Sequence, residues 1–163
     1  MLRLSKLTDY ATVILCFMVM DRIKVVASVE IAEATGISLP TVSKILKILV
    51  KSGVLNSVRG ARGGYRLARA PEKISVAEVI CALEGPIAVT ECSISDHNCE
   101  QSPKCSIRGN WTVINTAIQS ALESVSVADL TQPGNVAIDG LKVPVESLYR
   151  KRRQKEFGES NVS

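Results

Sequence analysis

Aromatic residues, histidine and long hydrophobic runs are scarce in this chain of 163 residues. Aromatics make up 4% of the sequence and there is one histidine, although 46% of the residues are hydrophobic. The core is therefore expected to be aliphatic, which suits helical packing. Because no run of about 18 apolar residues occurs, the sequence predicts no membrane span.

Two further absences limit the function. The basic residues near the N-terminus, Arg3 and Lys6, are not followed by the small-residue cleavage site of a secretory signal, so we expect a cytoplasmic protein. The single histidine leaves no Ser/His/Asp set, and the chain has no phosphate-binding glycine loop. An enzyme is therefore not expected.

Charge is distributed unevenly along the chain. Residues 1–70 hold eleven Lys/Arg against four Asp/Glu, a net charge of +7, whereas residues 71–130 hold three against eight, a net charge of −5. A basic segment of this kind is typical of proteins that bind a polyanion such as nucleic acid. Residues 131–163 lose periodicity and contain a basic stretch at 150–155, and we expect this tail to be mobile.

The first half of the chain has the pattern of a winged helix-turn-helix domain, predicted over residues 1–85. Apolar residues recur there at the three- and four-residue steps of helices, and two short runs bounded by turn residues read as strands. Two helices joined by a tight glycine turn and followed by a basic hairpin make up this motif. The fold class is therefore mainly α with a small β wing. The expected helices span residues 7–20, 28–35, 39–52 and 75–84, the expected strands span 54–58 and 65–68, and residues 25–27 suit a short strand.

The third helix of this domain has a polar face that suits the major groove of B-DNA. Its hydroxyl groups can meet base edges or phosphates, and its lysines neutralise phosphates. Arginines in the hairpin loop can reach a phosphate or the minor groove, and the loop glycines, Gly60, Gly63 and Gly64, let the backbone come close. The alternatives are a solvated basic surface or a winged helix that contacts protein. The expected contacts to double-stranded DNA are Ser38, Pro40, Thr41, Ser43, Lys44, Lys47, Arg59, Gly60 and Arg62.

A further helix, longer than the others, is predicted over residues 108–128. Its apolar residues are spaced as in the seam of a coiled coil. Few apolar elements remain to cover this seam, so we expect a dimerisation helix over 108–130, with packing on its own domain as the alternative. A two-fold homodimer would place two recognition helices on a palindromic operator. The seam consists of Trp111, Ile114, Ile118, Ala121 and Val125.

Three cysteines, Cys92, Cys99 and Cys105, crowd into fourteen positions of a polar loop predicted over residues 86–107. In a cytoplasmic chain such a cluster indicates a metal or redox site rather than disulfides. The spacing is not that of the usual zinc knuckles, although it does not exclude zinc. Three thiolates suit an iron–sulfur cluster whose fourth ligand comes from elsewhere, and His97 in the loop is one candidate.

The other two cysteines, Cys16 and Cys81, lie in apolar stretches with helical spacing. We expect both to be small buried hydrophobic residues.

Six short segments along the first 130 residues carry a family pattern. Together with the three clustered cysteines and Trp111, they resemble the Rrf2 family of bacterial transcription regulators, especially the IscR-like and SUF-system regulators of iron–sulfur assembly. The segments are Leu4–Ser5–Lys6, Asp9–Tyr10–Ala11, Gly36–Ile37–Ser38–Leu39, Ser57–Val58–Arg59–Gly60, Gly63–Gly64–Tyr65 and Glu78–Val79–Ile80.

The resemblance implies a winged-helix homodimer with a [2Fe–2S] or [4Fe–4S] cluster on the three cysteines. IscR-like members have a histidine three positions after the third cysteine, and here that position is Arg108, which cannot ligate a cluster. In nitric-oxide-sensing relatives an aspartate of the other subunit completes the site. Asp9 matches this aspartate and is preferred to His97 as the fourth ligand. Its alternative role is that of a negative charge at the N-terminus of a helix, which the helix dipole favours. Arg59 matches a DNA-contacting arginine, and Ser43 replaces an IscR-like glutamate.

These features lead to one hypothesis and several alternatives. The hypothesis is an iron–sulfur cluster-sensing repressor of the genes for iron–sulfur assembly through the SUF system. The same cysteines could instead sense nitric oxide, oxidants or zinc. A small iron–sulfur electron carrier is a further alternative, which predicts a cluster but no sequence-specific DNA binding.

Overall fold

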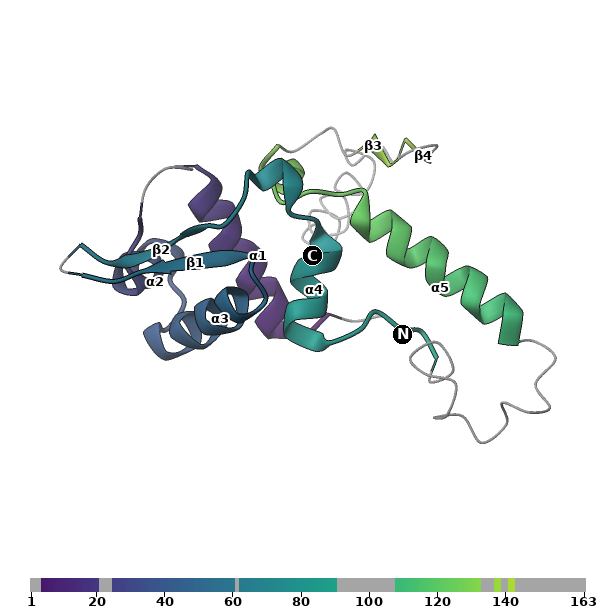
Figure 1. The fold of residues 1–163 in the computed structure, drawn as a ribbon, viewed down its shortest axis with the longest axis horizontal. Helices are drawn as coiled ribbons and strands as arrows, with labels where there is room; N and C mark the ends of the chain where they lie inside the picture. Colours follow the sequence, from purple (N-terminus) through teal and green to yellow (C-terminus); the bar gives the residue numbers. More distant parts are fainter. Residues whose placement is uncertain are drawn as a thin grey trace, which may run out of the picture.

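The computed structural model describes residues 4–20, 25–60, 62–90, 108–132, 137–138 and 141–142. Most of the described chain is helical, with one small antiparallel hairpin in its first half, and the predicted mainly α fold with a β wing is confirmed (Figure 1). No helix among these residues has the length and apolar character needed to cross a membrane. The elements in chain order are α1 (Lys6–Val19), α2 (Ser28–Thr35), α3 (Leu39–Lys51), β1 (Leu55–Val58), β2 (Gly64–Leu67), η1 (Pro71–Lys73), α4 (Val76–Glu84), α5 (Arg108–Glu123), η4 (Asp129–Thr131), β3 (Ala137–Ile138) and β4 (Leu141–Lys142).

An aliphatic core lies between the first four α-helices. Four apolar residues of α3 at helical spacing are fully buried, and α1 contributes a matching buried face that includes Ile14 and Leu15. Each buried leucine or isoleucine stabilises the fold by about 1.5–3 kcal/mol relative to an exposed one. Burial of this face fixes which side of α3 points outward. The fully buried residues of α3 are Val42, Ile45, Leu46 and Leu49.

The hairpin is attached to the helical core by one extra backbone pairing. In β1 and β2, Leu55 pairs with Leu67 and Val58 with Gly64. Val26, just before α2, donates its N–H to the carbonyl of Tyr65 at 2.9 Å and accepts the Tyr65 N–H at 2.8 Å. The short strand expected at residues 25–27 is thus a single bridge, which holds β2 against the start of α2.

The helix predicted over residues 108–128 ends at Glu123, and this part of the prediction is wrong. Beyond the helix, the Val125 carbonyl accepts the N–H of Val76, and the N–H of Val127 donates to the carbonyl of Ile74, both at 2.8 Å. Val127 is fully buried in the core. The helix stops because the chain gains this backbone pairing and the burial of Val127, so Val125 is not part of a helical seam.

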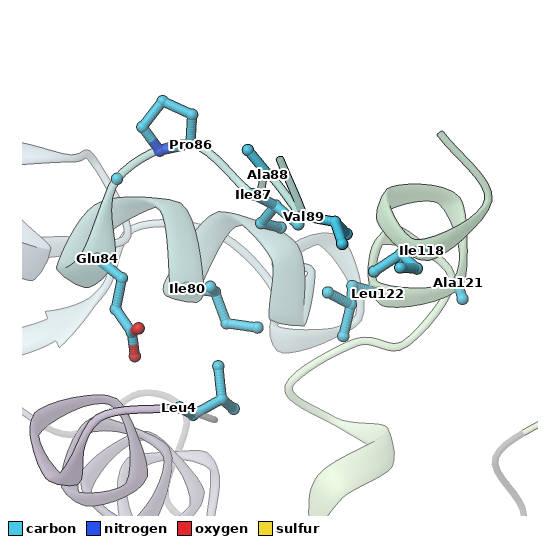
Figure 2. A pocket seen from close by; sticks show the side chains of 11 residues that line it. Leu4, Ile80, Glu84, Pro86, Ile87, Ala88, Val89, Ile118, Ala121 and Leu122 are labelled. Atoms are coloured by element: carbon cyan, nitrogen blue, oxygen red, sulfur yellow. The ribbon is translucent and has the colours of Figure 1, made fainter. Parts of the chain in front are cut away.

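The helix α5 projects from the body of the molecule at the end opposite the hairpin (Figure 1). Two of its apolar side chains, Val113 and Ile114, are 70% and 43% exposed. A hollow of about 610 Å³ lies between α4, α5 and residues 85–89, with Ile80 and Leu122 among its apolar walls (Figure 2). Most of the surface of α5 is therefore left uncovered by the described chain.

The expectation that Cys81 is buried is wrong, because its side chain is exposed on α4. Nearly every residue of α4 is apolar, so its periodicity did not indicate which side neighbouring elements cover. Cys16 is half-buried, and this burial raises the pKa of its thiol. The more exposed Cys81 is the more accessible of the two thiols.

Candidate nucleic-acid interface

The outward face of α3 carries a row of lysines. Lys44, Lys47 and Lys51 are all exposed and follow one another at three- and four-residue intervals, so they lie along one side of the helix. We call these three residues the lysine stripe. Thr41 and Ser43 are half-buried on either side of it. The arrangement places positive charge in the middle of the helix face and hydroxyl groups at its edges, as groove binding requires.

The start of α3 is exposed as well. Ser38 occupies the N-cap position and Pro40 lies in the first turn, where a missing N–H costs little. The hydroxyl oxygens of Ser38 and Thr41 are 2.9 Å apart, within hydrogen-bond distance of each other. Both polar groups and the first turn of the helix are therefore presented to the outside.

The tip of the hairpin adds two arginines to this surface. Arg59 and Arg62 are both exposed, and close to them the N–H of Gly63 donates to the carbonyl of Gly60 at 2.9 Å. Gly60 has a φ of 121°, a conformation that favours glycine. The hairpin and α3 lie side by side at one end of the molecule, and α3 packs against β1 (Figure 1).

Gly63 and Gly64 have a structural role that sequence reasoning missed. A Cβ atom on Gly63 would lie 2.5 Å from the carbonyl oxygen of Val58. A Cβ atom on Gly64 would overlap the carbonyl oxygen of Val26, where β2 pairs with the chain before α2. We expected these glycines to bring the backbone close to DNA, but the backbone that they approach here belongs to this chain.

Two more arginines show that an exposed side chain need not have a charge that is free to bind another molecule. Arg66 is exposed on β2, while its neighbours Tyr65 and Leu67 are half-buried, so Arg66 is an exposed cation beyond those predicted to contact DNA. Alternation along the strand was the signal that pointed to it. Arg69 is paired with Glu78 through two contacts of 3.0 and 3.3 Å. Its charge is thus compensated within the chain.

The predicted cluster ligands are described only in part. Cys92, Cys99, Cys105 and His97 lie outside the described residues, whereas Asp9 is exposed in the first turn of α1. In the parts of the chain that the structure does describe, no group of three or more His, Cys, Asp and Glu side chains could hold a metal ion. Three thiolates and one exposed carboxylate form a donor set whose chemistry fits an iron–sulfur cluster.

The start of α1, where Asp9 lies, is tied to the end of α4. Oε1 of Glu84 accepts hydrogen bonds from the Ser5 N–H at 2.8 Å and from the Thr8 hydroxyl at 2.5 Å. Both bonds lower the pKa of Glu84, and the bond from Thr8 has the larger effect. Because the folded pKa lies below the unfolded one, the link stabilises the protein above the ordinary carboxyl pKa. It is lost as the pH falls through the lowered value.

Comparison with known proteins relates most of the chain to bacterial regulators. The Rrf2 family, described as an iron-dependent transcriptional regulator, matches residues 4–133. The regulator IscR of Xenorhabdus nematophila is 35% identical over 103 residues, which are 63% of this chain and 62% of that protein. The regulator NsrR of Shouchella clausii is 30% identical over 131 residues, which are 79% of this chain and 88% of that protein.

A solved structure supports the same relationship. CymR, the global cysteine regulator of B. subtilis, matches with a TM-score of 0.64 at 26% identity, over 83% of this chain and 100% of CymR. All three named proteins are regulators rather than enzymes, and the predicted winged-helix fold and non-enzymatic role are confirmed. Because the family match spans well over half of the sequence, this chain belongs to the Rrf2 family of DNA-binding transcriptional regulators.

Proposed function

We propose that this protein is a cytoplasmic homodimer that represses SUF-system genes and responds to an iron–sulfur cluster on Cys92, Cys99 and Cys105. The observation that carries the DNA-binding part is the grouping of the lysine stripe with Arg59 and Arg62 at one end of the molecule. Such a surface neutralises phosphates on both sides of a groove. The cluster part rests on the cysteine spacing and on the resemblance to IscR-like regulators.

Dimerisation through α5 is supported by its uncovered apolar side chains. Val113 and Ile114 are 70% and 43% exposed, and Ile114 lies one turn before Ile118, which lines the apolar hollow beside α4. A second copy of the helix would remove these groups from water. A two-fold dimer would also present two α3 helices to half-sites about 34 Å apart, which is one turn of DNA.

The cluster would supply a centre whose presence and charge change with iron supply and oxidation. Asp9 is the preferred fourth ligand, contributed by the partner subunit, because it is exposed and acidic at the position that the resemblance indicates. Binding of the cluster must favour one distance between the two recognition helices over another. A ligand shifts a conformational equilibrium only if its affinities for the two conformations differ.

A second candidate function is nitric oxide sensing through the same three cysteines. The match of Asp9 to the aspartate of nitric-oxide-sensing relatives favours it, and Asp9 is exposed in the first turn of α1. Both candidates need the same cluster site. They differ in whether iron supply or nitric oxide changes the affinity for DNA.

Arg59→Ala is expected to weaken DNA binding by about tenfold for each wing that contacts DNA, because each wing loses a phosphate partner worth roughly 1.4 kcal/mol. The slope of the logarithm of the binding constant against the logarithm of salt concentration should fall by about 0.9 for each wing. Titrating a labelled operator fragment at several salt concentrations measures both quantities.

Arg69→Ala is the matched control for this variant. It removes the same side chain from a residue already paired with Glu78, and exposed ion pairs of this kind contribute only about 0–1 kcal/mol to stability. Its salt slope should equal that of the unmodified protein. If Arg59→Ala also left affinity and slope unchanged, the hairpin would have no part in DNA binding.

Asp9→Ala is expected to speed cluster loss by about tenfold or more, because one of the four ligands is removed. His97→Ala should change the rate little. The decay of visible absorption in the presence of an iron chelator, measured under anaerobic conditions, compares the two variants. Glu33→Ala, at an exposed acid on α2, controls for the loss of a surface charge. Faster loss from His97→Ala than from Asp9→Ala would reverse the assignment.

A further inference from the structure

Among the described side chains of α5, only that of Asn115 is buried. It is 9% exposed, whereas its neighbours Ile114 and Thr116 are exposed. Asparagine forms helices less readily than alanine or leucine, so helix formation does not explain its presence in the middle of α5. A buried amide needs hydrogen-bond partners, because leaving it unpaired costs about 1–3 kcal/mol.

The partners of Asn115 lie in the backbone that leads from α4 toward the cysteines. Its Nδ2 donates to the carbonyl of Ile87, and its Oδ1 accepts the N–H of Val89, both at 3.1 Å. One side chain thus satisfies a carbonyl and an N–H two residues apart, as a neighbouring strand would. Figure 2 shows Ile87, Ala88 and Val89 beside the hollow between α4 and α5.

The same stretch of chain is also fixed at its beginning. Glu84, the last residue of α4, accepts the two hydrogen bonds from Ser5 and Thr8 at the start of α1. Residues 85–90 are therefore held to α1 at one end and to α5 at the other. Cys92 follows Thr90 by two positions in the sequence.

We propose that Asn115 is a positioning residue that holds the chain entering the cysteine cluster in a fixed register against α5. A change at the cysteines is then passed to the helix at which the two subunits meet, through the backbone of Ile87 and Val89. This inference rests on the proposed function, because it assigns a coupling role between the cluster and the dimer helix. Asn115 is not one of the residues that the cysteine spacing indicates.

The first arm of the test needs no cluster. Asn115→Leu is similar in size but makes neither hydrogen bond, and Asn110→Leu is the matched control at an exposed asparagine of the same helix. Amide hydrogen exchange of the cluster-free protein, read at Val89 by NMR, should be on the order of tenfold faster in Asn115→Leu. It should be unchanged in Asn110→Leu.

The second arm measures cluster loss to a chelator under anaerobic conditions. Asn115→Leu should lose its visible absorption about tenfold faster than the unmodified protein, since residues that support metal ligands typically contribute 10–100-fold to retention. Asn110→Leu should stay within about twofold. If Asn115→Leu does not fold, Asn115→Asp serves instead, because its carboxylate keeps the acceptor and cannot donate to Ile87.

The outcomes separate this inference from the function on which it rests. An unmodified protein that never holds iron would overturn the proposed function and the coupling together. An unmodified protein that holds iron, with an Asn115 variant that releases it at the same rate, would overturn the coupling alone. Equal exchange at Val89 in all variants would also overturn it.

Discussion

Replacing Cys92, Cys99 and Cys105 together with serine is expected to give a colourless protein that holds neither iron nor sulfide. Thiolates are the ligands that iron–sulfur clusters require, and serine keeps the size of the side chain without supplying a soft sulfur ligand. Visible absorption and chemical analysis of iron and sulfide after anaerobic purification measure this loss. The effect is expected to be complete rather than partial, since the whole thiolate set is removed.

The matched control is the double variant with serine at Cys16 and Cys81. These two thiols lie on α1 and α4, away from the proposed ligand set in the sequence, and the double variant should keep the colour of the unmodified protein. Full iron content in the triple variant would exclude the three cysteines as ligands. Loss of iron only from the double variant would move the site to the helices.

Gly64→Ala is expected to destabilise the protein by roughly 3 kcal/mol. A methyl group at this position overlaps the carbonyl of Val26, so β2 must separate from the chain before α2 and give up the two backbone hydrogen bonds between Val26 and Tyr65. Thermal unfolding followed by circular dichroism should show a midpoint lower by about 10 °C.

Ser57→Ala controls for a change at an exposed position of the same hairpin and should stay within about 0.5 kcal/mol of the unmodified protein. DNA binding by Gly64→Ala should be lost together with stability, because the hairpin that carries Arg59 is attached through this pairing. A Gly64→Ala protein with unchanged stability would show that close backbone approach at Gly64 is not required.

The elements that sequence predicted well are those in which local spacing and burial agree. In α3 the apolar residues occupy one side, the lysines occupy the other, and Pro40 marks the start, so each local signal indicates the same helix. The exposed positions expected to meet DNA followed directly from that assignment. The arginine-bearing hairpin was predicted for the same reason, because turn residues and strand-forming residues alternate there.

The features that sequence missed depend on partners far away in the chain. The end of α5 is decided by backbone pairing of residues 125 and 127 with residues 74–76, which helical spacing does not encode. The partners of Asn115 lie 26 and 28 positions away. Cys81 has the same local pattern as a buried residue, and only the arrangement of neighbouring elements leaves it exposed.

The proposed regulation depends on a thiolate-held cluster that changes how two subunits bind a DNA duplex. The most direct measurement is the affinity of one anaerobic preparation for an operator fragment, determined before and after removal of its cluster, beside the triple serine variant. We predict that the affinity of the unmodified protein changes by about 5- to 150-fold, while the variant does not respond. Iron-free protein that discriminates the operator equally well with and without cluster reconstitution would contradict the account.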